Sequence, residues 1–386
     1  MTHRERFFQI LEGKRPKNIP FIPDITDWYN GNHTPKGCAM KHGAGCYIPD
    51  NDDIRNFDGT IPEKYKKWSL MDFYRNFDWC FHGHIYDWYD TNYSGGIEEV
   101  RVDSKGEYDI ELRFPNGKKL TRKYKLAVDG SWCPTEHFAK NENELKLLMK
   151  AISAQSYVPK HDYVKSIIDE IGGQGQVDIE LARSPFGKLI HEYFGLENTV
   201  YALMDYPDVI DEFLKLQEQK DLEIVQLACK DPARLICLAD HADETLISPA
   251  WYKKYCIPYY KKVSDILHKH KKMISTHLDG NFKGFFNILG ETGFDLLDGC
   301  TPAPMFNYEP EELAAAMPDD MYAFIGVPAT LFCQNVPTKE IFKMADRIMT
   351  AFEGRGFINV GDILPPNGDI EQVIELGNYV KSIYNK

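Results

Sequence analysis

The chain has 386 residues, of which 43% are hydrophobic and 27% are charged, a balance typical of a folded protein and not of a disordered one. Its formal net charge of −13 is spread along the sequence, so we expect neither nucleic acid nor an anionic membrane surface as a partner. The nine cysteines form no CxxC pair, no apolar run is long enough to span a membrane, and the polar amino terminus lacks the apolar core of a signal peptide. These features predict a reduced, cytoplasmic protein.

The first third of the chain predicts a helix, a strand, an irregular cap and an antiparallel excursion, in that order. After an amphipathic opening helix, Asn18–Ile25 has the composition of a first strand. The stretch 27–90 is rich in Trp, Tyr, Gly, Asn and His and has little periodicity, which is typical of an irregular cap. Between Tyr93 and Lys125, polar and apolar residues alternate around an Asn-Gly turn, which predicts a β-hairpin or meander.

The rest of the chain alternates β-rich runs with helical patterns, the signature of a parallel sheet wrapped by helices. We therefore predict an α/β fold, a (βα)8 TIM barrel, as a single domain over residues 1–386 with the cap and the β excursion inside residues 27–137. The sequence does not identify the eighth strand. The other predicted strands are Gln176–Ala182, Arg234–Asp240, Met273–His277, Phe294–Asp298, Met321–Gly326 and Phe357–Asp362.

Polar side chains gather where these predicted strands end. In a TIM barrel the loops after the strands converge at the carboxyl-end face, where the active site lies. We therefore expect candidate catalytic and binding residues among the following: Asp24, Glu180, Arg183, Asp240, His241, Asp243, Glu244, His277, Asp279, Asp298, Cys300 and Asp362.

The His277-Leu278-Asp279 sequence at the end of one strand has the spacing of a metal site. Residues two apart in an extended chain point to the same face, so the imidazole and the carboxylate can bind one ion. The alternative is that the pair only hydrogen-bonds the turn at Gly280. Two neighbours favour the ion: Asp362 ends the last strand, and His241 and Glu244 follow the strand before His277.

The stretch from Cys237 to Asn281 resembles the uroporphyrinogen decarboxylase superfamily, whose members share an acidic loop, an Ile-Ser-Pro turn, a Pro-Tyr-Tyr-Lys helix and a strand ending in His-x-Cys-Gly-Asn. The opening residues and the closing GFINVGDILPPNGDIEQV are similar to that family as well. Members that decarboxylate porphyrinogens carry an arginine-containing loop near the amino terminus. Here Asp24 and Asp27 stand in that region, which argues against a polyanionic porphyrinogen as substrate.

The other large branch comprises zinc-dependent methyltransferases that work with a corrinoid protein. The resemblance implies metal ligands at His277, Asp279 and Asp362, where the two aspartates stand in place of that branch's cysteines. Harder His and Asp ligands leave a zinc ion more Lewis-acidic toward oxygen than thiolates do. The resemblance therefore implies an O-demethylase component that moves a methyl group from a small O-methylated substrate to the cobalt of a corrinoid protein.

Further site residues are expected around this centre. His277, Asp279, His241, Glu244 and Asp24 are the candidate catalytic residues. The aromatic cap suits a methoxylated aromatic substrate, although its rings could simply pack the cap over the barrel. His82-Gly83-His84 has a metal-like spacing, but we assign it to a cap loop with a surface or hydrogen-bonding role. The candidate substrate-binding residues are Trp28, Tyr29, Glu180, Arg183 and Cys300.

Two other functions remain open on the sequence. A metal-free, decarboxylase-like relative could use His277, Asp279 and Asp362 for acid–base chemistry. A non-catalytic protein could instead hold a corrinoid or another tetrapyrrole at the barrel mouth.

Overall fold

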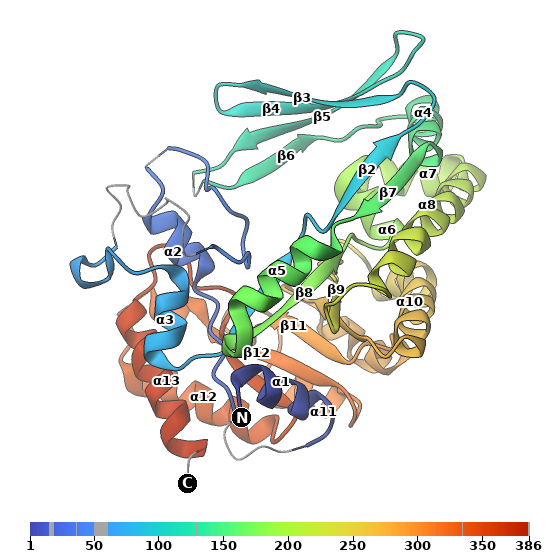
Figure 1. The fold of residues 1–386 in the computed structure, drawn as a ribbon. Helices are drawn as coiled ribbons and strands as arrows, with labels where there is room; N and C mark the ends of the chain where they lie inside the picture. Colours follow the sequence, from blue (N-terminus) through green and yellow to red (C-terminus); the bar gives the residue numbers. More distant parts are fainter. Residues whose placement is uncertain (15–18, 36, 50–60, 129, 334, 385–386) are drawn as a thin grey trace.

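The computed structural model describes residues 1–14, 19–35, 37–49, 61–128, 130–333 and 335–384. A curled parallel sheet forms its centre, with helices packed around the outside (Figure 1). The strands follow the order β1-β8-β9-β10-β11-β12-β13. This confirms the predicted α/β, TIM-barrel-like fold. The strand bounds are β1 Phe81–Ile85, β8 Gly175–Leu181, β9 Leu235–Leu238, β10 Met273–His277, β11 Leu296–Cys300, β12 Tyr322–Pro328 and β13 Gly356–Gly361.

Six of the seven strands lie where the sequence predicts them, within two residues or so at most ends. All residues of β9, β11 and β12 are buried, because helices cover one face of each strand and the barrel interior covers the other. The helices between the strands include α5 His161–Ile171, α8 Pro207–Ala228, α10 Ile257–Lys269, α11 Pro310–Ala316, α12 Thr338–Ala351 and α13 Ile370–Tyr384.

The barrel is closed by an extended segment and not by a regular strand. Ile22 donates to the carbonyl of Ile358 in β13 at 3.0 Å, and Cys80 donates to the carbonyl of Phe21 at 2.9 Å, so the segment lies between β13 and β1. The sequence predicts a strand here, but Pro20 and Pro23 have no backbone N–H and cannot complete a hydrogen-bonded ladder. The described part of the segment therefore occupies the place of a strand without the regular pairing of one.

The strand missing from the sequence prediction is β1, which pairs in parallel with β8. It lies inside the stretch 27–137 that we assigned to the cap and the β excursion, so that assignment is wrong for Phe81–Ile85. The rest of the stretch includes α2 Thr26–Asn32, α3 Leu70–Phe77 and the predicted antiparallel meander. The meander has four strands, β3 Glu98–Ser104, β4 Glu107–Arg113, β5 Lys119–Leu126 and β6 Trp132–Glu136.

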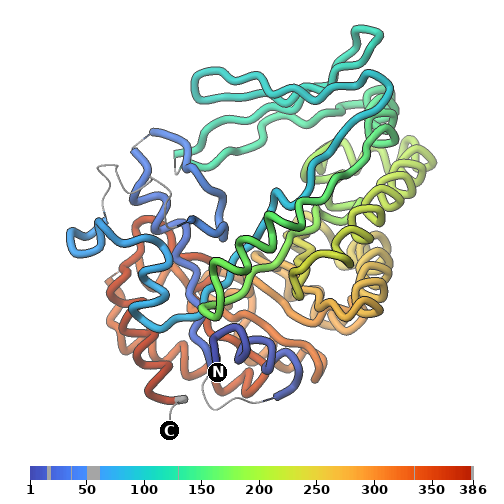
Figure 2. The backbone as a smooth tube through the Cα atoms, in the orientation of Figure 1, coloured from blue at the N-terminus to red at the C-terminus, as the bar shows by residue number. Residues whose placement is uncertain are grey.

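A two-stranded ribbon joins the meander to the barrel. It pairs β2 Tyr89–Tyr93 with β7 Gln155–Pro159, and the chain enters it directly after β1. The tube in Figure 2 follows this ribbon away from the barrel to the meander, while both chain ends lie at the far side of the barrel. The meander therefore stands beyond the carboxyl ends of the barrel strands, the end that carries the active site in TIM barrels.

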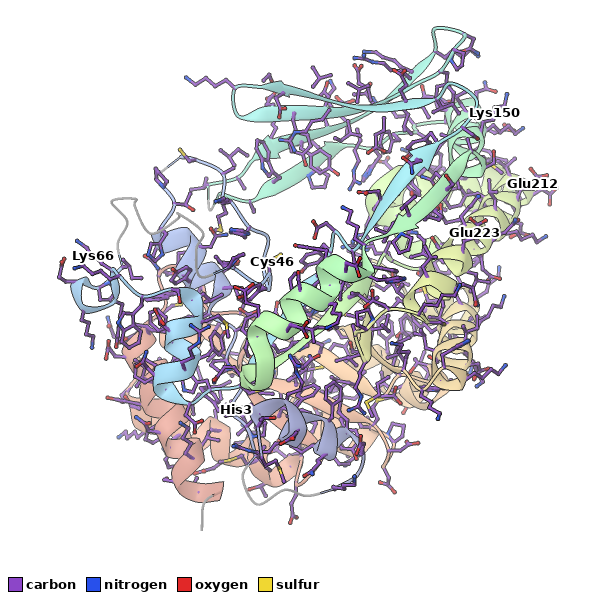
Figure 3. All side chains as sticks on the ribbon, in the orientation of Figure 1. His3, Cys46, Lys66, Lys150, Glu212 and Glu223 are labelled. Carbon is purple, nitrogen blue, oxygen red and sulfur yellow. The ribbon has the colours of Figure 1, made fainter. Side chains whose placement is uncertain are left out.

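The amino end of the barrel is plugged by helix α1 His3–Leu11. Phe7 and Phe8 of this helix pack with the first residues of the strands in an apolar cluster that includes Leu235, Leu296 and Phe357. Figure 3 labels a residue at each end of the barrel. His3 lies in the helix that plugs the amino end, and Cys46, whose backbone forms an isolated β-bridge with His84, lies by the mouth. Because the plug closes one end, the opposite mouth is the open end of the barrel interior.

Candidate active site

A cavity of about 180 Å³ opens at the carboxyl ends of the strands. Asp24 comes from the closing segment, Glu180 from β8, and His277 from the end of β10. The cavity brings together six of the predicted site residues, namely Asp24, Glu180, His241, His277, Asp279 and Asp362, and it adds His84, Tyr86, Cys237 and backbone around Gly45. Its lining among the described residues contains no Lys or Arg.

His277 is the residue on which the predicted metal ligands converge. Its Nε2 lies 3.6 Å from Oδ1 of Asp362 and 3.8 Å from Oδ1 of Asp279. Ligands held at about 2.0–2.1 Å around a tetrahedral zinc ion are roughly 3.3 Å apart, so each carboxylate lies close enough to His277 to share an ion with it. The group whose donor atoms all lie within 4.8 Å of one another is His241, His277 and Asp279, so Asp362 would have to move closer to join it. The other ring nitrogen, Nδ1, lies 3.2 Å from the buried carboxylate of Asp298. A carboxylate behind the imidazole is the usual way a metal-binding histidine is oriented.

His241 lies beside the same centre. Its Nδ1 is 2.7 Å from Oδ1 of Asp279, and its ring centroid is 4.7 Å from that of His277. Donor atoms of His241, His277 and Asp279 all lie within 4.8 Å of one another. His241 can therefore either orient Asp279 or join it as a ligand.

Carboxylates outnumber imidazoles in this part of the barrel, and this excess of negative charge shifts the pKa values of His277 and Asp298. Burial opposes protonation of His277, but Asp362 and Asp298 outweigh it and raise the pKa of His277 well above its ordinary value. Burial raises the pKa of Asp298, yet the hydrogen bond and charge of His277 overcome this and hold that pKa far below its usual range. In the absence of an ion, protonated histidine is thus the cation that balances the carboxylates.

Two carboxyl groups of the cavity are weaker acids than usual. Burial raises the pKa of Glu180 to about 7 and that of Asp24 to about 6. Asp24 is held in place by Thr26, whose backbone N–H and hydroxyl donate to its Oδ1 at 2.8 and 2.7 Å. A carboxyl group with a pKa near neutrality can give or take a proton at physiological pH.

We expect the raised pKa of Glu180 to appear in the pH dependence of stability of the metal-free protein. The folded state holds this proton more tightly than the unfolded chain, so Glu180 makes the free energy of unfolding fall as pH rises from about 4.5 to about 7. Glu180→Gln should remove that part of the fall. Denaturant unfolding of both proteins between pH 4.5 and 8 measures it, and parallel pH curves for variant and wild type would contradict it.

His84 lies in strand β1 and not in a cap loop, so the assignment of His82-Gly83-His84 to a cap loop is wrong. The burial of Phe81–Ile85 alternates, so Phe81, Gly83 and Ile85 point outward into the packing with the helices, while His82 and His84 point into the barrel. Nδ1 of His84 lies 2.8 Å from Oδ1 of Asp178 on β8, and its Nε2 lies 3.6 Å from Oδ2 of Asp298. The apolar-polar alternation of FHGHI was the available signal, and it was obscured by the irregular sequence around it.

The structure places three predicted polar site residues outside the cavity. The carboxylate of Glu244 accepts hydrogen bonds from the backbone N–H of Gly284 and from the side chain of Asn307, so it fastens a loop. The guanidinium of Arg183 lies 3.7 Å from Glu192. Cys300 is fully buried, and its thiol contacts the carbonyl of Asp298. Burial raises the pKa of this thiol, which makes it an unreactive packing residue.

The two predicted aromatic contacts to substrate also lie away from the cavity. Trp28 and Tyr29 of α2 are 3% and 1% exposed, and they pack against Phe73 of α3. The hydroxyl of Tyr29 donates to the carbonyl of Trp68. Both rings therefore pack the cap over the barrel, which is the alternative to substrate binding that the sequence left open. Tyr86, which follows β1, is the aromatic side chain that lines the cavity.

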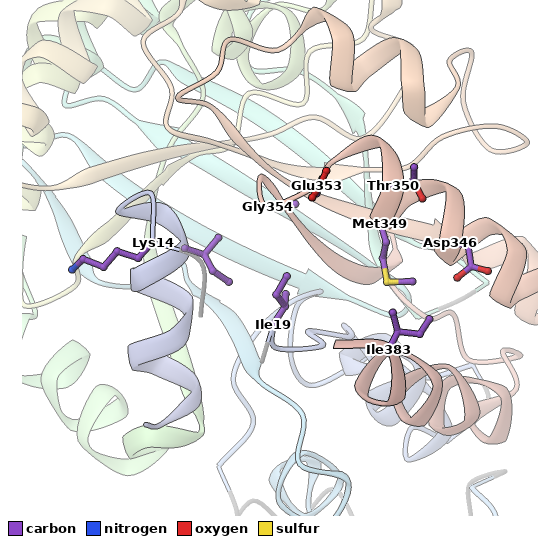
Figure 4. Close-up of a pocket in the computed structure, with 10 residues that line it drawn as sticks. Lys14, Ile19, Asp346, Met349, Thr350, Glu353, Gly354 and Ile383 are labelled. Carbon is purple, nitrogen blue, oxygen red and sulfur yellow. The ribbon is translucent and has the colours of Figure 1, made fainter. Parts of the chain in front are cut away.

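A larger cavity of about 570 Å³ lies at the opposite end of the barrel, between α1, α12 and α13 (Figure 4). Its lining includes Ile10, Ile19, Met349 and Ile383 beside Lys14, Asp346 and Glu353, and among the described residues it has no His or Cys. The amino ends of barrel strands serve stability rather than catalysis. The smaller cavity at the mouth, which has the histidines, is therefore the candidate active site.

The fold and the mouth together define a TIM-barrel enzyme. Residues 163–383 match the family described as uroporphyrinogen decarboxylase (URO-D), and the chain belongs to this family. No curated protein matches it. Among the described helices, none has both the length and the apolar character needed to cross a bilayer.

Solved structures extend the fold over the whole chain. A methyltransferase from Methanosarcina mazei is similar with a TM-score of 0.59 at 14% identity, covering 100% of this chain and 99% of that one. A B12-independent methionine synthase from a Shewanella species gives a TM-score of 0.41 at 9% identity, with 95% of each chain covered. At these identities, the first likeness shows a shared fold, and the second carries no argument.

Proposed function

We propose that this protein is a methyltransferase that moves a methyl group from a small O-methylated substrate to the cobalt of a corrinoid protein. The observation that carries the proposal is the convergence of Asp279 and Asp362 on Nε2 of His277 at the barrel mouth. The methyltransferase fold of the similar Methanosarcina mazei structure supports it.

The donor set of this centre fits zinc. His277, Asp279 and Asp362 would hold the ion, with Asp298 behind the imidazole. A zinc ion bound there supplies Lewis acidity toward the oxygen that the methyl group leaves. Carboxylate ligands in place of thiolates favour this role over activation of a thiol.

The remaining residues of the cavity bind the donor and handle the proton. Glu180, with a pKa of about 7, is able to protonate the departing oxygen, and Asp24 is a second acid of this kind. His241 fixes Asp279 by the contact at 2.7 Å. The cavity of about 180 Å³ is smaller than the roughly 300–1,000 Å³ sites that enclose drug-sized ligands, so the donor is small. A methoxylated aromatic would have Tyr86 as its aromatic neighbour.

The corrinoid partner must bring its cobalt within bonding distance of the methyl group, and therefore docks at the mouth. The ribbon and the meander stand on this side of the barrel (Figure 1). A porphyrinogen with many carboxylates is disfavoured, because the described lining offers Asp24, Glu180, Asp279 and Asp362 and no cationic Lys or Arg.

The proposal is tested with protein loaded with zinc, reduced cob(I)alamin as acceptor and a panel of methyl donors. We expect methyl-cobalt absorbance and an equal amount of demethylated alcohol or phenol with at least one methoxylated aromatic or other O-methyl donor. Omitting the donor and using chelator-treated protein are the controls. Absence of methyl transfer from methoxylated aromatics, methanol and methylamines alike would contradict the proposal.

The metal-free alternative draws on the same two weak acids. If chelator-treated protein turns over a small carboxylate substrate as fast as loaded protein does, Glu180 and Asp24 perform acid–base chemistry without an ion. Catalysis lost with the metal favours the methyltransferase.

A further inference from the structure

Below the mouth, the barrel interior holds a second group of histidines and carboxylates, which shares Asp298 with the centre at His277. His82 and His84 of β1 both face inward, and Asp298 of β11 lies across from them. Donor atoms of these three residues lie within 4.8 Å of one another. We propose that His82, His84 and Asp298 form a second site for a divalent transition-metal ion, deeper in the barrel than the site at His277.

The two histidines are oriented in the same way by the neighbouring strand. The register of β1 and β8 sets His82 opposite Gln176 and His84 opposite Asp178. Nδ1 of His84 lies 2.8 Å from the fully buried Asp178, and Nδ1 of His82 contacts the side-chain amide of Gln176. The amide nitrogen of Gln176 faces Nδ1 of His82, which places the ring proton on Nε2 in the metal-free protein. Metal binding at Nε2 therefore requires the amide of Gln176 to turn its oxygen, which has no partner, to the ring and accept the proton at Nδ1. An anchored Nδ1 and a free Nε2 are the usual arrangement of metal-binding histidines.

Polar atoms in this layer are buried without hydrogen-bond partners. They are Nε2 of His82, Oδ2 of Asp178 and Oδ1 of Asn359. The His82 side chain is 10% exposed, and Nε2 lies 3.6 Å from Oδ2 of Asp178, too far for a hydrogen bond. Buried polar atoms normally find a partner, since leaving one without costs about 1–3 kcal/mol. Orphaned atoms of a ligand type therefore point to a bound group.

A small void lies among these atoms. It measures about 20 Å³, and its polar wall consists of His82, His84, Asp298 and Asn359 on the deeper side and of Asp24, His277 and Asp362 on the side of the mouth, so it adjoins the centre at His277. This is the size of a single ion or water molecule. Ligands of a tetrahedral ion are about 3.3 Å apart, so donor atoms within 4.8 Å of one another need to approach by at most about 1.5 Å.

The charge of the interior favours a cation here. Six carboxylates, Asp24, Asp178, Glu180, Asp279, Asp298 and Asp362, face four imidazoles, His82, His84, His241 and His277. Two imidazoles and one carboxylate with oxygen neighbours are a donor set for zinc, iron(II), cobalt(II) or manganese(II).

Metal stoichiometry tests this site independently of methyl transfer. Protein stripped with a chelator is titrated with Zn²⁺ or Co²⁺ by calorimetry, and bound metal is counted after desalting. We expect two equivalents for the wild type, one for His82→Phe and one for Asp362→Asn. Phenylalanine is chosen because His82 stacks between the rings of Phe7 and Phe324 at 6.2 and 4.7 Å, where a phenyl ring fits.

The same variants separate folding from binding. Without metal, His82→Phe should unfold at about the same temperature as the wild type, because it removes the buried Nε2 that has no partner but also the contact of Nδ1 with Gln176. With excess zinc the wild type should gain more thermal stability than His82→Phe, since only the wild type fills the deeper site. Equal gains would overturn the proposal.

The deeper metal site does not depend on the proposed methyl transfer, and different results would contradict each of them. If the wild type binds one equivalent of metal, and His82→Phe abolishes this binding while Asp362→Asn retains it, the deeper site is supported and the metal site at the mouth is contradicted. One equivalent with the opposite dependence, or no metal at all, would overturn the deeper site.

Discussion

Asp362→Asn is expected to lower methyl transfer by more than about 100-fold while the protein stays folded. Oδ1 of Asp362 faces Nε2 of His277 at 3.6 Å, and a neutral amide is a poor replacement for a charged ligand. Changing even a neighbour of a metal ligand typically costs about 10–100-fold in affinity or activity, so a ligand itself should cost more. Without metal, the variant loses a carboxylate that repels its neighbours but also the partner of protonated His277, so its melting temperature should be equal to or slightly below that of the wild type.

The measurement combines turnover, bound metal and thermal unfolding on the same samples. Asp320→Asn is the matched control, because Asp320 is exposed and precedes β12 at the other end of the barrel. NMR titration adds an independent reading: the pKa of His277 should fall in Asp362→Asn, since Asp362 is the main charge that raises it. His277→Ala should lose metal and turnover as well. An Asp362→Asn protein with full metal content would refute the ligand assignment.

The largest effect on stability is expected from Lys188→Met, at about 3–5 kcal/mol near pH 8. Lys188 is 4% exposed and pairs with Asp221 of α8, which is 3% exposed. Removing the cation leaves a buried carboxylate with only the amide of Gln217 as partner. Burial already raises the pKa of Asp221 to about 6, and without Lys188 it rises further. The cost should therefore shrink toward pH 5, where the carboxyl group is protonated in the folded state.

A double variant tests the cause. Lys188→Met with Asp221→Asn removes both charges and keeps an acceptor for Gln217, so most of the lost stability should return. Lys165→Met is the control, because Lys165 and Asp169 form an exposed pair worth at most about 0.5 kcal/mol. Chemical denaturation at pH 5 and pH 8 supplies the numbers. A Lys188→Met cost no larger than that of Lys165→Met would show that the buried pair is energetically neutral.

The sequence was sufficient for the barrel where a strand is buried on both faces. Runs such as those of β9 and β12 are continuous and apolar, so they stand out between amphipathic helices. It failed at β1 because the inward residues there are His82 and His84, and a polar barrel interior removes the continuous apolar run. It misjudged the closing segment because the apolar residues of a strand are present while Pro20 and Pro23 prevent the ladder.

The site was predictable to the extent that it follows from strand ends and spacing. His277, Asp279 and Asp362 are brought together because their strands end at one face, although their role as ligands stays a prediction. Glu244 could not be placed in this way. His241 adopts a left-handed backbone conformation with φ of 48°, and the loop then turns so that Glu244 binds Gly284 and Asn307. Strand periodicity cannot predict where the side chain of Glu244 points, because Glu244 lies three residues after this turn.

The closing segment makes one side of the mouth less tightly held than the others. Elsewhere in the sheet, neighbouring strands are joined by several residue pairs, as in the six pairs between β12 and β13. At the segment, a few separate hydrogen bonds take that role: from Ile22 and Cys80, from Leu364 to the carbonyl of Asp24, and from the hydroxyl of Tyr74 to the carbonyl of Pro23. Local opening costs least where backbone hydrogen bonds are fewest. We therefore expect the wall that carries Asp24 to open more readily than the paired strands, which would suit the proposed reaction, in which a donor and then a cobalt centre must enter the cavity.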